Sequence, residues 1–511
     1  MKYIKILSLA LCTVVLTTGC DGFLKEVSQD EVIPSSADDL QQLLLGEGYQ
    51  TYRQFMPYLD MLTDDVMNNY TESSNQQGYV EHGKSPFCWE VDMAERMKET
   101  GVGGNSWADY YSLIKGCNVV LDMIDGVTGS EATKGNVRGQ ALALRGYYYF
   151  MLANLYAKPY NAPGIDRTKE LCVPLILTST VRDEFPTRNT MDEVYTQIEK
   201  DLLEAMPLME TYGQRNIRDK VTDQFVHLFL CRLYLYQERW EESSRQADIV
   251  LEKQPELLQI ANYASRDNSG FYRMHVYHPQ SPELIWCYAS SNDNFDFVGT
   301  VNGSDTPAFL ISNDLKSLYQ YNRNMKGKRG DMRALFYYNY YNVGSMQFDP
   351  VTGTFQQATE MYWGNHCYNS GDAGKGFRTA EAYLNRAEAK LQLWLNGGND
   401  NLREEALEDI NTLRQSRWEG TYKPIMLTDK QELWQFYKDE RRREFAFDDH
   451  RWFDLRRWGM PRLVHIFTQT KNEPQEIVLE EGDLRYVLQI PQEVLDRNPQ
   501  LKQNPRASVV Q

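Results

Sequence analysis

The chain has 511 residues, of which 42% are hydrophobic and 24% charged, as in a soluble globular protein with a large core. Its formal net charge of −17 repels phosphate backbones, which argues against a nucleic-acid partner. Tyrosine is unusually frequent, because its 33 copies exceed the 20 phenylalanines and 10 tryptophans combined. A tyrosine ring has an apolar face and a polar tip, so this surplus suits a protein that stacks on polar rings or on partners.

Residues 1–19 have the pattern of a bacterial secretion signal. A short basic start precedes an apolar run from Ile6 to Thr18, which is too short for a bilayer span of roughly 20 residues. The run ends in the sequence LTTGC, which resembles a lipoprotein cleavage box whose cysteine carries diacylglycerol. We therefore expect a mature protein that begins at the lipidated Cys20 and, without the two leader lysines, has a net charge of −19. The alternative is ordinary secretion with an incidental cysteine.

Residues 20–36 are polar and mixed, which predicts a lipidated tether ahead of a single domain over residues 37–511. Leucines at helical spacing predict a first helix from Ala37. Residues 66–106 are rich in Asn, Ser, Gln and Gly, and they predict a loop-like insertion. Aromatic rings in a long polar loop are poor candidates for the core, and long loops in compact domains often bind ligands.

The central part of the chain predicts paired helices. Helical periodicity covers residues 107–124 and 138–156, and Thr190 is suited to cap a further helix. Residues 225–237 and 239–251 form a pair with small and apolar residues near the characteristic positions of a tetratricopeptide repeat, namely Leu230, Cys231, Tyr234, Ser243, Ala247 and Val250. A looser pair covers residues 377–390 and 404–416.

Residues 256–370 differ in amino-acid composition from the helical segments on either side. They are rich in Asn, Asp, Ser, Gly and Tyr and have few long apolar periods, so we expect a second loop-rich insertion with minor β structure. Within it, residues 281–286 predict a short strand or a turn onto the core, with Trp286 as a core residue.

Residues 440–459 alternate aromatic rings with both signs of charge. Two short helices meeting near Asp448 and Asp449 would point the large apolar side chains inward, namely Phe445, Phe447, Trp452, Phe453, Leu455 and Trp458. The six arginines of the stretch would then pair with acids within a turn or two. Guanidinium–carboxylate pairs are geometrically demanding, so we expect a structural ion-pair cluster. A phosphate-binding patch is disfavoured because acids interleave with the bases.

Several of these segments together resemble the signatures of the SusD/RagB family of Bacteroidetes surface lipoproteins. The resemblance includes the lipoprotein box, the W-x-x-x-Y-x-x-I-x-x-x-N pattern from Trp107 and the R-x-x-A-x-x-L-R pattern from Arg138. It also includes R-x-A-E-x-Y-L-N from Arg378, the stretch 440–459 and the N-P-x-L-x-Q-N-P ending from Asn498. The resemblance implies a mainly α fold of tetratricopeptide-like helix pairs, an α-α superhelix with loop-rich insertions.

The same resemblance implies a function. Such a protein would be non-catalytic, anchored in the outer membrane by its lipid and facing the cell exterior. It would capture oligosaccharides and deliver them to a SusC-like TonB-dependent barrel. Its partners would be that barrel, the oligosaccharide and the membrane, with no cofactor.

The candidate ligand-binding residues come from composition and loop context. Sugars present apolar C–H faces on which rings can stack and hydroxyl groups that amides can bind. The candidates are therefore rings and asparagines of the two insertions, namely Asn68, Asn69, Tyr70, Tyr79, Trp89, Tyr288, Asn294, Phe295, Phe297, Tyr362 and Trp363. For each ring alone, structural packing is an equal alternative.

An enzyme is the rival from another class. A glycoside hydrolase would need two converging carboxylates, and the visible acidic pairs are Asp64–Asp65 and Asp448–Asp449. Adjacent residues seldom converge on one bond. The scattered histidines and cysteines lack metal-ligand spacing, so no metal site is expected. Two nearer alternatives keep the architecture: import of peptides, or a transporter lid without its own ligand.

Overall fold

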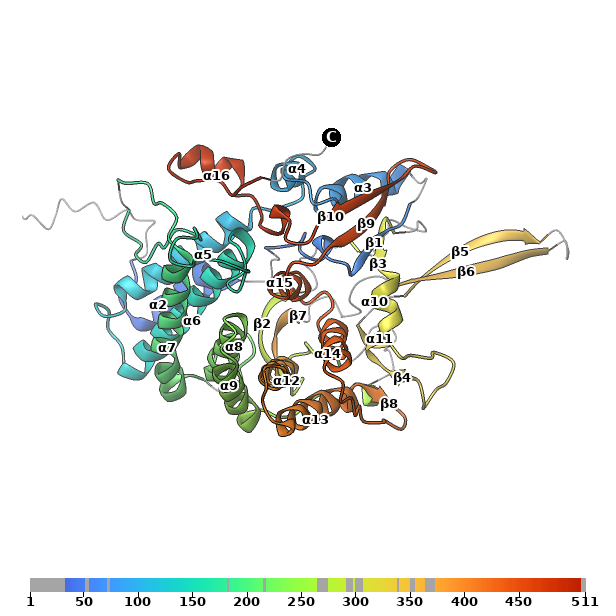
Figure 1. Cartoon of the computed structure of the whole chain (residues 1–511). Helices are drawn as coiled ribbons and strands as arrows, with labels where there is room; N and C mark the ends of the chain where they lie inside the picture. The colour runs from blue at the N-terminus through green and yellow to red at the C-terminus, as the bar shows by residue number, and fades with distance from the viewer. Residues whose placement is uncertain are drawn as a thin grey trace, which may run out of the picture.

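The computed structural model describes residues 33–50, 55–70, 74–181, 183–214, 217–263, 274–290, 297–298, 307–337, 340–349, 354–363 and 373–506. Helices dominate this part of the chain and its strands form two-stranded sheets, which confirms the mainly α class (Figure 1). The leader, Cys20 and the tether up to residue 32 lie outside the described residues.

Three long helices form one side of the molecule, at the left of Figure 1. They are α5 (Ser106–Met123), α6 (Glu131–Tyr156) and α7 (Met191–Tyr212), and α6 packs against both of the others. The side chain of Thr190 accepts a hydrogen bond from Glu193 N, and the Glu193 carboxylate accepts one from Thr190 N. This capping box confirms the predicted helix start.

The repeat-like helix pairs are neighbours in space, in the same order as they occur in the chain. The helices α8 (Asp223–Tyr236) and α9 (Trp240–Lys253) form the first pair, and α9 packs on α12 (Thr379–Leu395) of the second, whose partner is α13 (Asp400–Ser416). Within the first pair, Ser243 Oγ donates to Cys231 O at 2.9 Å. Both residues are fully buried, so the two helices approach closely at these small side chains.

The segment 66–106 is more ordered than its composition predicts, because it contains α3 (Ser74–Phe87) and α4 (Met93–Glu99). Two glycines and Pro86 in α3 made the sequence resemble a loop. The structure uses one of these glycines for packing: a Cβ added at Gly83 would lie 2.4 Å from the ring of Phe309. The expectation of an irregular loop is therefore wrong for these residues, where tertiary packing outweighs local propensity.

The remaining elements connect and cover these helices. Near the N-terminus lie α2 (Ala37–Leu43), which confirms the predicted first helix, a π-helical turn (Leu44–Gly48) and a 3-10 turn (Asp60–Leu62). The second insertion contains a 3-10 turn (Ile260–Tyr263), α10 (Asn313–Leu318) and α11 (Arg333–Phe336). Near the C-terminus lie a 3-10 turn (Leu484–Tyr486) and α16 (Gln492–Arg497).

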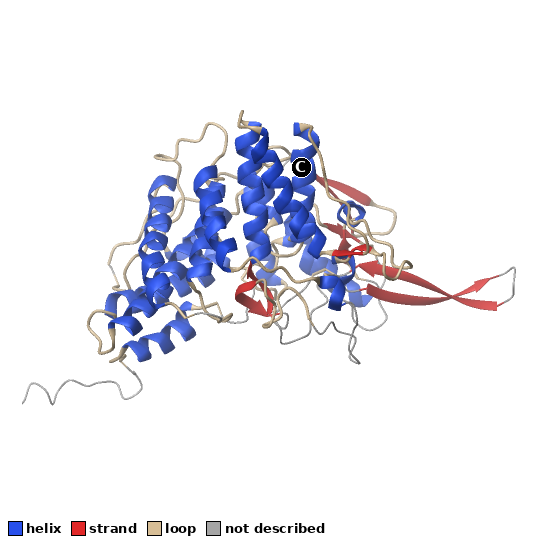
Figure 2. Ribbon diagram, turned by 90° about the horizontal axis from the view of Figure 1, so that it is seen from below, coloured by secondary structure: helices blue, strands red, loops and turns tan. Residues whose placement is uncertain are grey.

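The sheets are small and antiparallel. The strand pairs are β1 (Val66–Asn68) with β3 (Phe309–Ile311), β2 (Leu284–Ser290) with β7 (Ala373–Arg378), β4 (Gly330–Asp331) with β8 (Trp418–Glu419), β5 (Tyr340–Asp349) with β6 (Thr354–Trp363), and β9 (Leu463–Thr468) with β10 (Pro474–Leu479). The β5–β6 hairpin projects away from the helices (Figures 1 and 2).

Aromatic rings fill the centre of the main core. Trp286 on β2 is fully buried, which confirms it as a core residue. Its ring stacks on Phe377 of β7 with centroids 5.8 Å apart and meets Phe225 of α8 edge-on at 4.9 Å. Tyr147 of α6 approaches the same group. The buried tyrosines of α6 therefore serve packing.

Two glutamates of α14 (Lys430–Glu444) are the centre of the predicted ion-pair cluster. Glu444 accepts hydrogen bonds from Arg333 at 3.0 Å and Arg417 at 2.9 Å, and it also pairs with Arg378. Glu440 accepts from Arg333 at 2.8 Å and from Arg443 at 2.7 Å, and it also pairs with Arg414. Both carboxylates are fully buried. Burial opposes their ionisation, but the surrounding arginine charges lower the pKa of each below its usual range.

The arginines of the stretch find partners over longer distances than expected. Arg441 pairs with Asp454 of α15 (Arg451–Arg457) at 2.7 Å. Arg442 and Arg451, however, pair with Asp65 and Asp64, which lie near the other end of the chain. The cluster is structural, as predicted, but local pairing accounts for only part of it.

Arg456 lacks the acidic partner that was expected for each arginine of the stretch. It donates to Ala157 O, while its buried Nε and Nη1 have no hydrogen-bond partner in the described part of the chain. Burial without a carboxylate lowers its pKa to about 10. Trp458, expected inward, is partly exposed, whereas the other large apolar side chains of the stretch are buried, as predicted.

Replacing Glu444 tests how much the ion-pair cluster contributes to the stability of the fold. Glu444→Gln removes the charge that three buried guanidinium groups share, so we expect the free energy of unfolding in urea to fall by about 3–5 kcal/mol. The matched control is Glu204→Gln, which breaks an exposed pair with Lys200 at 3.9 Å and should change stability by less than about 0.5 kcal/mol. Equal effects of the two substitutions would contradict a central role for Glu444.

Candidate ligand-facing surface

Asn68 and Asn69 connect three strands at one end of the molecule. Asn68 Nδ2 donates to Ala308 O at 3.2 Å, and its Oδ1 accepts from Thr468 N of β9 at 2.9 Å. Asn69 Nδ2 donates to Pro307 O at 2.8 Å. Both amides thus hold β1 to its neighbours, and any ligand would have to share or replace these bonds. Their proposed contact with a sugar stays a prediction.

Trp89 is held in place by backbone and by histidine. Its Nε1 donates to Leu62 O at 2.9 Å, and its ring stacks on the imidazole of His465 with centroids 4.1 Å apart. Phe87 stacks on His465 at the same separation, so the imidazole lies between two rings. Burial lowers the pKa of His465, although its hydrogen bonds to backbone carbonyls oppose this shift. Only 3% of Trp89 is exposed, which leaves little of its ring for a ligand.

Tyr79 and Tyr70 are the candidates with accessible rings. Both are partly exposed, and Tyr79 lies on α3, edge-on to His82 with centroids 6.3 Å apart. The same helix carries Lys84, whose Nζ donates to Gln469 Oε1 at 3.0 Å beyond the end of β9. A partly exposed ring beside polar side chains is the kind of surface on which a sugar ring can stack.

The remaining candidates divide into three groups. Tyr288 and Phe297 are buried, and Tyr288 belongs to the aromatic core, with its hydroxyl donating to Asp449 Oδ2 at 3.3 Å. Asn294 and Phe295 lie outside the described residues. Tyr362 and Trp363 lie on β6, opposite Tyr341 and Tyr340, where only the backbone is described. None of these positions is tested as a ligand contact.

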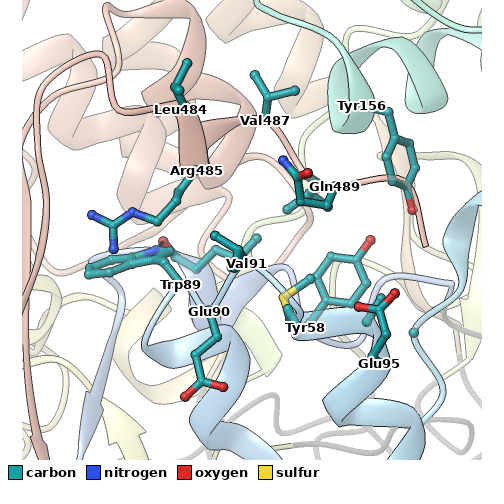
Figure 3. Close-up of a pocket in the computed structure, with 15 residues that line it drawn as sticks. Tyr58, Trp89, Glu90, Val91, Glu95, Tyr156, Leu484, Arg485, Val487 and Gln489 are labelled. Carbon is teal, nitrogen blue, oxygen red and sulfur yellow. Dashed lines mark hydrogen bonds between the residues drawn. The ribbon is translucent and has the colours of Figure 1, made fainter. Parts of the chain in front are cut away.

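A small cavity lies beside Trp89, between α4 and the C-terminal segment (Figure 3). Glu90 and Glu95 line one side, and Arg485 and Gln489 line the other. Its volume of about 30 Å³ holds one or two waters but no sugar ring. A ligand on this face would therefore bind on the open surface. No sequence pattern pointed to Arg485 or Gln489, because the segment that carries them is far from α4 in the chain.

The acidic pairs considered for catalysis are engaged elsewhere. Asp64 accepts from Arg451 at 2.7 Å, and although its burial opposes ionisation, the charges of Arg442 and Arg451 lower its pKa. Asp449 pairs with Lys375. Asp448 accepts from Arg378 at 3.1 Å, and burial raises its pKa to about 6. Within the described ranges, no group of three metal-type side chains is close enough to hold an ion.

Stacked helix pairs define a helical-repeat scaffold, and one face of it carries the partly exposed rings of Tyr70 and Tyr79. The chain belongs to the SusD family: residues 317–506 match the SusD family, and residues 23–235 match a SusD-like family described as starch-binding and associating with the outer membrane. The resemblance seen in the sequence is confirmed. The family comprises non-catalytic carbohydrate-binding proteins.

Individual relatives agree over nearly the whole chain. SusD-like protein P25 of Formosa agariphila is 22% identical, over 86% of this chain and 87% of that protein. A SusD-like carbohydrate-binding protein of Bacteroides vulgatus has a similar structure, with a TM-score of 0.65, 22% identity, and coverage of 93% of this chain and 99% of that one. A SusD superfamily protein of Bacteroides thetaiotaomicron gives a TM-score of 0.64 at 19% identity, over 92% of this chain and all of that one. At such identities the structures show the shared fold.

None of the described helices combines the length and the apolar content that a membrane-spanning helix needs.

Replacing Trp89 should primarily affect stability. Trp89→Ala removes the bond to Leu62 O and one of the two rings against His465, so we expect the free energy of unfolding to fall by about 3–5 kcal/mol. Tyr79→Ala, which removes a partly exposed ring from the same face, should cost about 1 kcal/mol. Chemical denaturation of both variants measures this, and a Trp89→Ala protein of unchanged stability would show that the ring is free for other contacts.

Proposed function

We propose that this protein captures oligosaccharides at the cell surface and delivers them to a SusC-like TonB-dependent transporter, without altering them chemically. The observation that carries this proposal is membership of the SusD family over both halves of the chain. The SusD-like carbohydrate-binding protein of Bacteroides vulgatus, which has a similar structure, supports the choice of sugar as ligand.

The ligand-facing surface supports the same chemistry. A sugar ring has C–H faces that can stack on Tyr79 and Tyr70, and hydroxyl groups that can bond to nearby amides and charges such as Gln469 and Lys84. Because the enclosed cavity beside Trp89 is too small for a sugar ring, recognition would use the open face and the shape of a longer chain.

The proposed location rests on the N-terminal sequence and on the family. A lipid on Cys20 would hold the protein to the outer membrane, and the polar residues up to 36 would give it reach. The transporter barrel would be the partner that receives the ligand.

Calorimetric titration tests the ligand class. The soluble chain cut after Cys20 is titrated with plant, host and microbial oligosaccharides, and we expect binding of one class without product formation. Tyr79→Ala should weaken that binding by about tenfold, because a stacked ring contributes on the order of 1 kcal/mol.

Tyr212→Ala is the matched control, since this ring is 37% exposed on α7, far from α3 (Figure 1). It should leave the affinity unchanged. If no oligosaccharide of the panel binds and peptides bind instead, the transported ligand is a peptide and the sugar proposal is wrong. Equal loss in both variants would show that the ligand does not bind over α3.

Lipid attachment is tested separately in cells. Cys20→Ala should abolish incorporation of labelled palmitate and release the protein from the outer membrane fraction, because the thiol carries the anchor. Cys12→Ala, which changes a cysteine inside the proposed leader, should leave labelling intact. Labelling that persists in Cys20→Ala would contradict the proposed anchor.

A further inference from the structure

A basic loop connects α10 to β4, at the right of Figure 1 and away from α3 and α4. Its residues 323–329 have the sequence RNMKGKR, so they carry four cations and no acid, in a chain whose 71 acidic residues exceed its 54 basic ones. Arg323, Lys326 and Lys328 are exposed. The side chains of Lys326 and Lys328 form no hydrogen bond or ion pair within the described part of the chain, so no described acid neutralises them.

Glu419 of β8 neutralises the last arginine of this loop and holds the loop in place. Its carboxylate accepts from Arg329 Nε at 2.8 Å and from Arg329 Nη2 at 2.6 Å. It also accepts from Gly327 N at 2.9 Å. The hydrogen bonds from Arg329 lower the pKa of Glu419 to about 2. Because Glu419 is occupied by Arg329, it leaves the charges of Lys326 and Lys328 uncompensated.

Backbone hydrogen bonds give the loop a defined shape. Asn322 N donates to Arg329 O at 2.9 Å, which closes the base of the loop. Within it, Lys328 N donates to Met325 O at 2.8 Å. The lysines therefore extend from an ordered backbone, and a partner that binds them need not first order the loop.

An exposed apolar side chain lies among these charges. Met325 is 49% exposed, although methionine is more often a buried residue. A Cβ added at Gly420 would lie 3.1 Å from the Cα of Lys328, so the segment after β8 runs beside the loop. That segment adds the exposed Lys423, whose side chain also has no partner among the described residues. We call residues 323–328 and Lys423 the basic surface.

This combination of charges and an apolar side chain matches an anionic membrane. Anionic headgroups attract lysines that lie near the bilayer surface. An apolar side chain between the lysines gains by entering the boundary between headgroups and acyl chains. A soluble polyanion would gain from the lysines but not from Met325, so the exposed methionine favours the membrane. The negative charge of the rest of the chain opposes this contact only where acids come within a Debye length of about 8–10 Å of the headgroups.

We propose that the basic surface contacts the anionic headgroups of a membrane, with its lysines on the headgroup phosphates and Met325 at their boundary with the acyl chains. The role of this contact in the cell rests on the proposed outer-membrane location, but the contact itself is separate from the lipid on Cys20. The 17 residues from Cys20 to Ser36 can extend to about 60 Å, which lets an anchored domain turn this surface towards the bilayer.

Co-sedimentation with vesicles tests the proposal on the soluble chain cut after Cys20, so the result is independent of the lipid anchor and of sugar binding. Vesicles of phosphatidylcholine with one third phosphatidylglycerol should bind the chain, and added salt should weaken this binding because the contact is ionic. Vesicles of phosphatidylcholine alone should bind at least about tenfold more weakly, and equal binding of the two would overturn the proposal. If dextran sulfate binds and the vesicles do not, the partner is a soluble polyanion and the membrane proposal is wrong.

Two loop variants locate the contact. Lys326→Gln combined with Lys328→Gln should weaken vesicle binding by about tenfold or more, and Met325→Ser should weaken it by about threefold. The matched control is Lys115→Gln combined with Lys200→Gln, which removes two exposed lysines from α5 and α7 at the left of Figure 1 and should leave binding unchanged. Thermal melting confirms that each variant is folded. Vesicle affinity that is unchanged in either loop variant, or reduced equally in the control, would overturn the proposal.

Discussion

The fold depends on the pairing of two buried carboxylates, Glu440 and Glu444, with arginines that come from distant parts of the chain. Arg333 belongs to the second insertion, Arg378 is the last residue of β7 just after that insertion, and Arg414 and Arg417 lie at the end of α13. A carboxylate loses its hydration when buried, and only several well-placed donors compensate for this. Each glutamate therefore fixes the relative positions of the elements that supply its arginines.

The same cluster also connects the helical repeats to the candidate ligand-facing surface. Arg442 and Arg451 reach Asp65 and Asp64, which directly precede β1, and β1 carries Asn68 and Asn69. The Asn68 side chain then fixes β9. The face proposed to meet the ligand is thus held by ion pairs and hydrogen bonds to distant elements, although it is built from short strands and turns. Such support favours a surface that keeps its shape before a ligand arrives.

Sequence reasoning succeeded where one local pattern decides the structure. The spacing of apolar residues in α6, the capping Thr190 and the repeat-like residues of α8 and α9 each specify a helix without help from distant residues. It failed for α3, whose glycines and proline are unfavourable in a helix until Phe309 packs against Gly83. The candidate site was harder, because loop rings were assumed to be exposed. Trp89 and Tyr288 are buried by residues that are distant in the chain, and the amino-acid composition of a loop does not reveal such contacts.

The tail near Asn504 adds a constraint on the order of events during folding. Asn504 Nδ2 donates at 2.8 Å to Tyr156 O, a carbonyl at the end of α6 that has no partner within its own helix, and also to Leu488 O. The two bonded residues of the first contact are 348 positions apart. The same carbonyl also accepts from Arg188 Nη2 at 3.2 Å, so Asn504 adds a second donor that is synthesised long after α6. A chain shortened before Asn504 would keep only the Arg188 donor at this helix end and would lose the bond that Asn504 makes to Leu488 O.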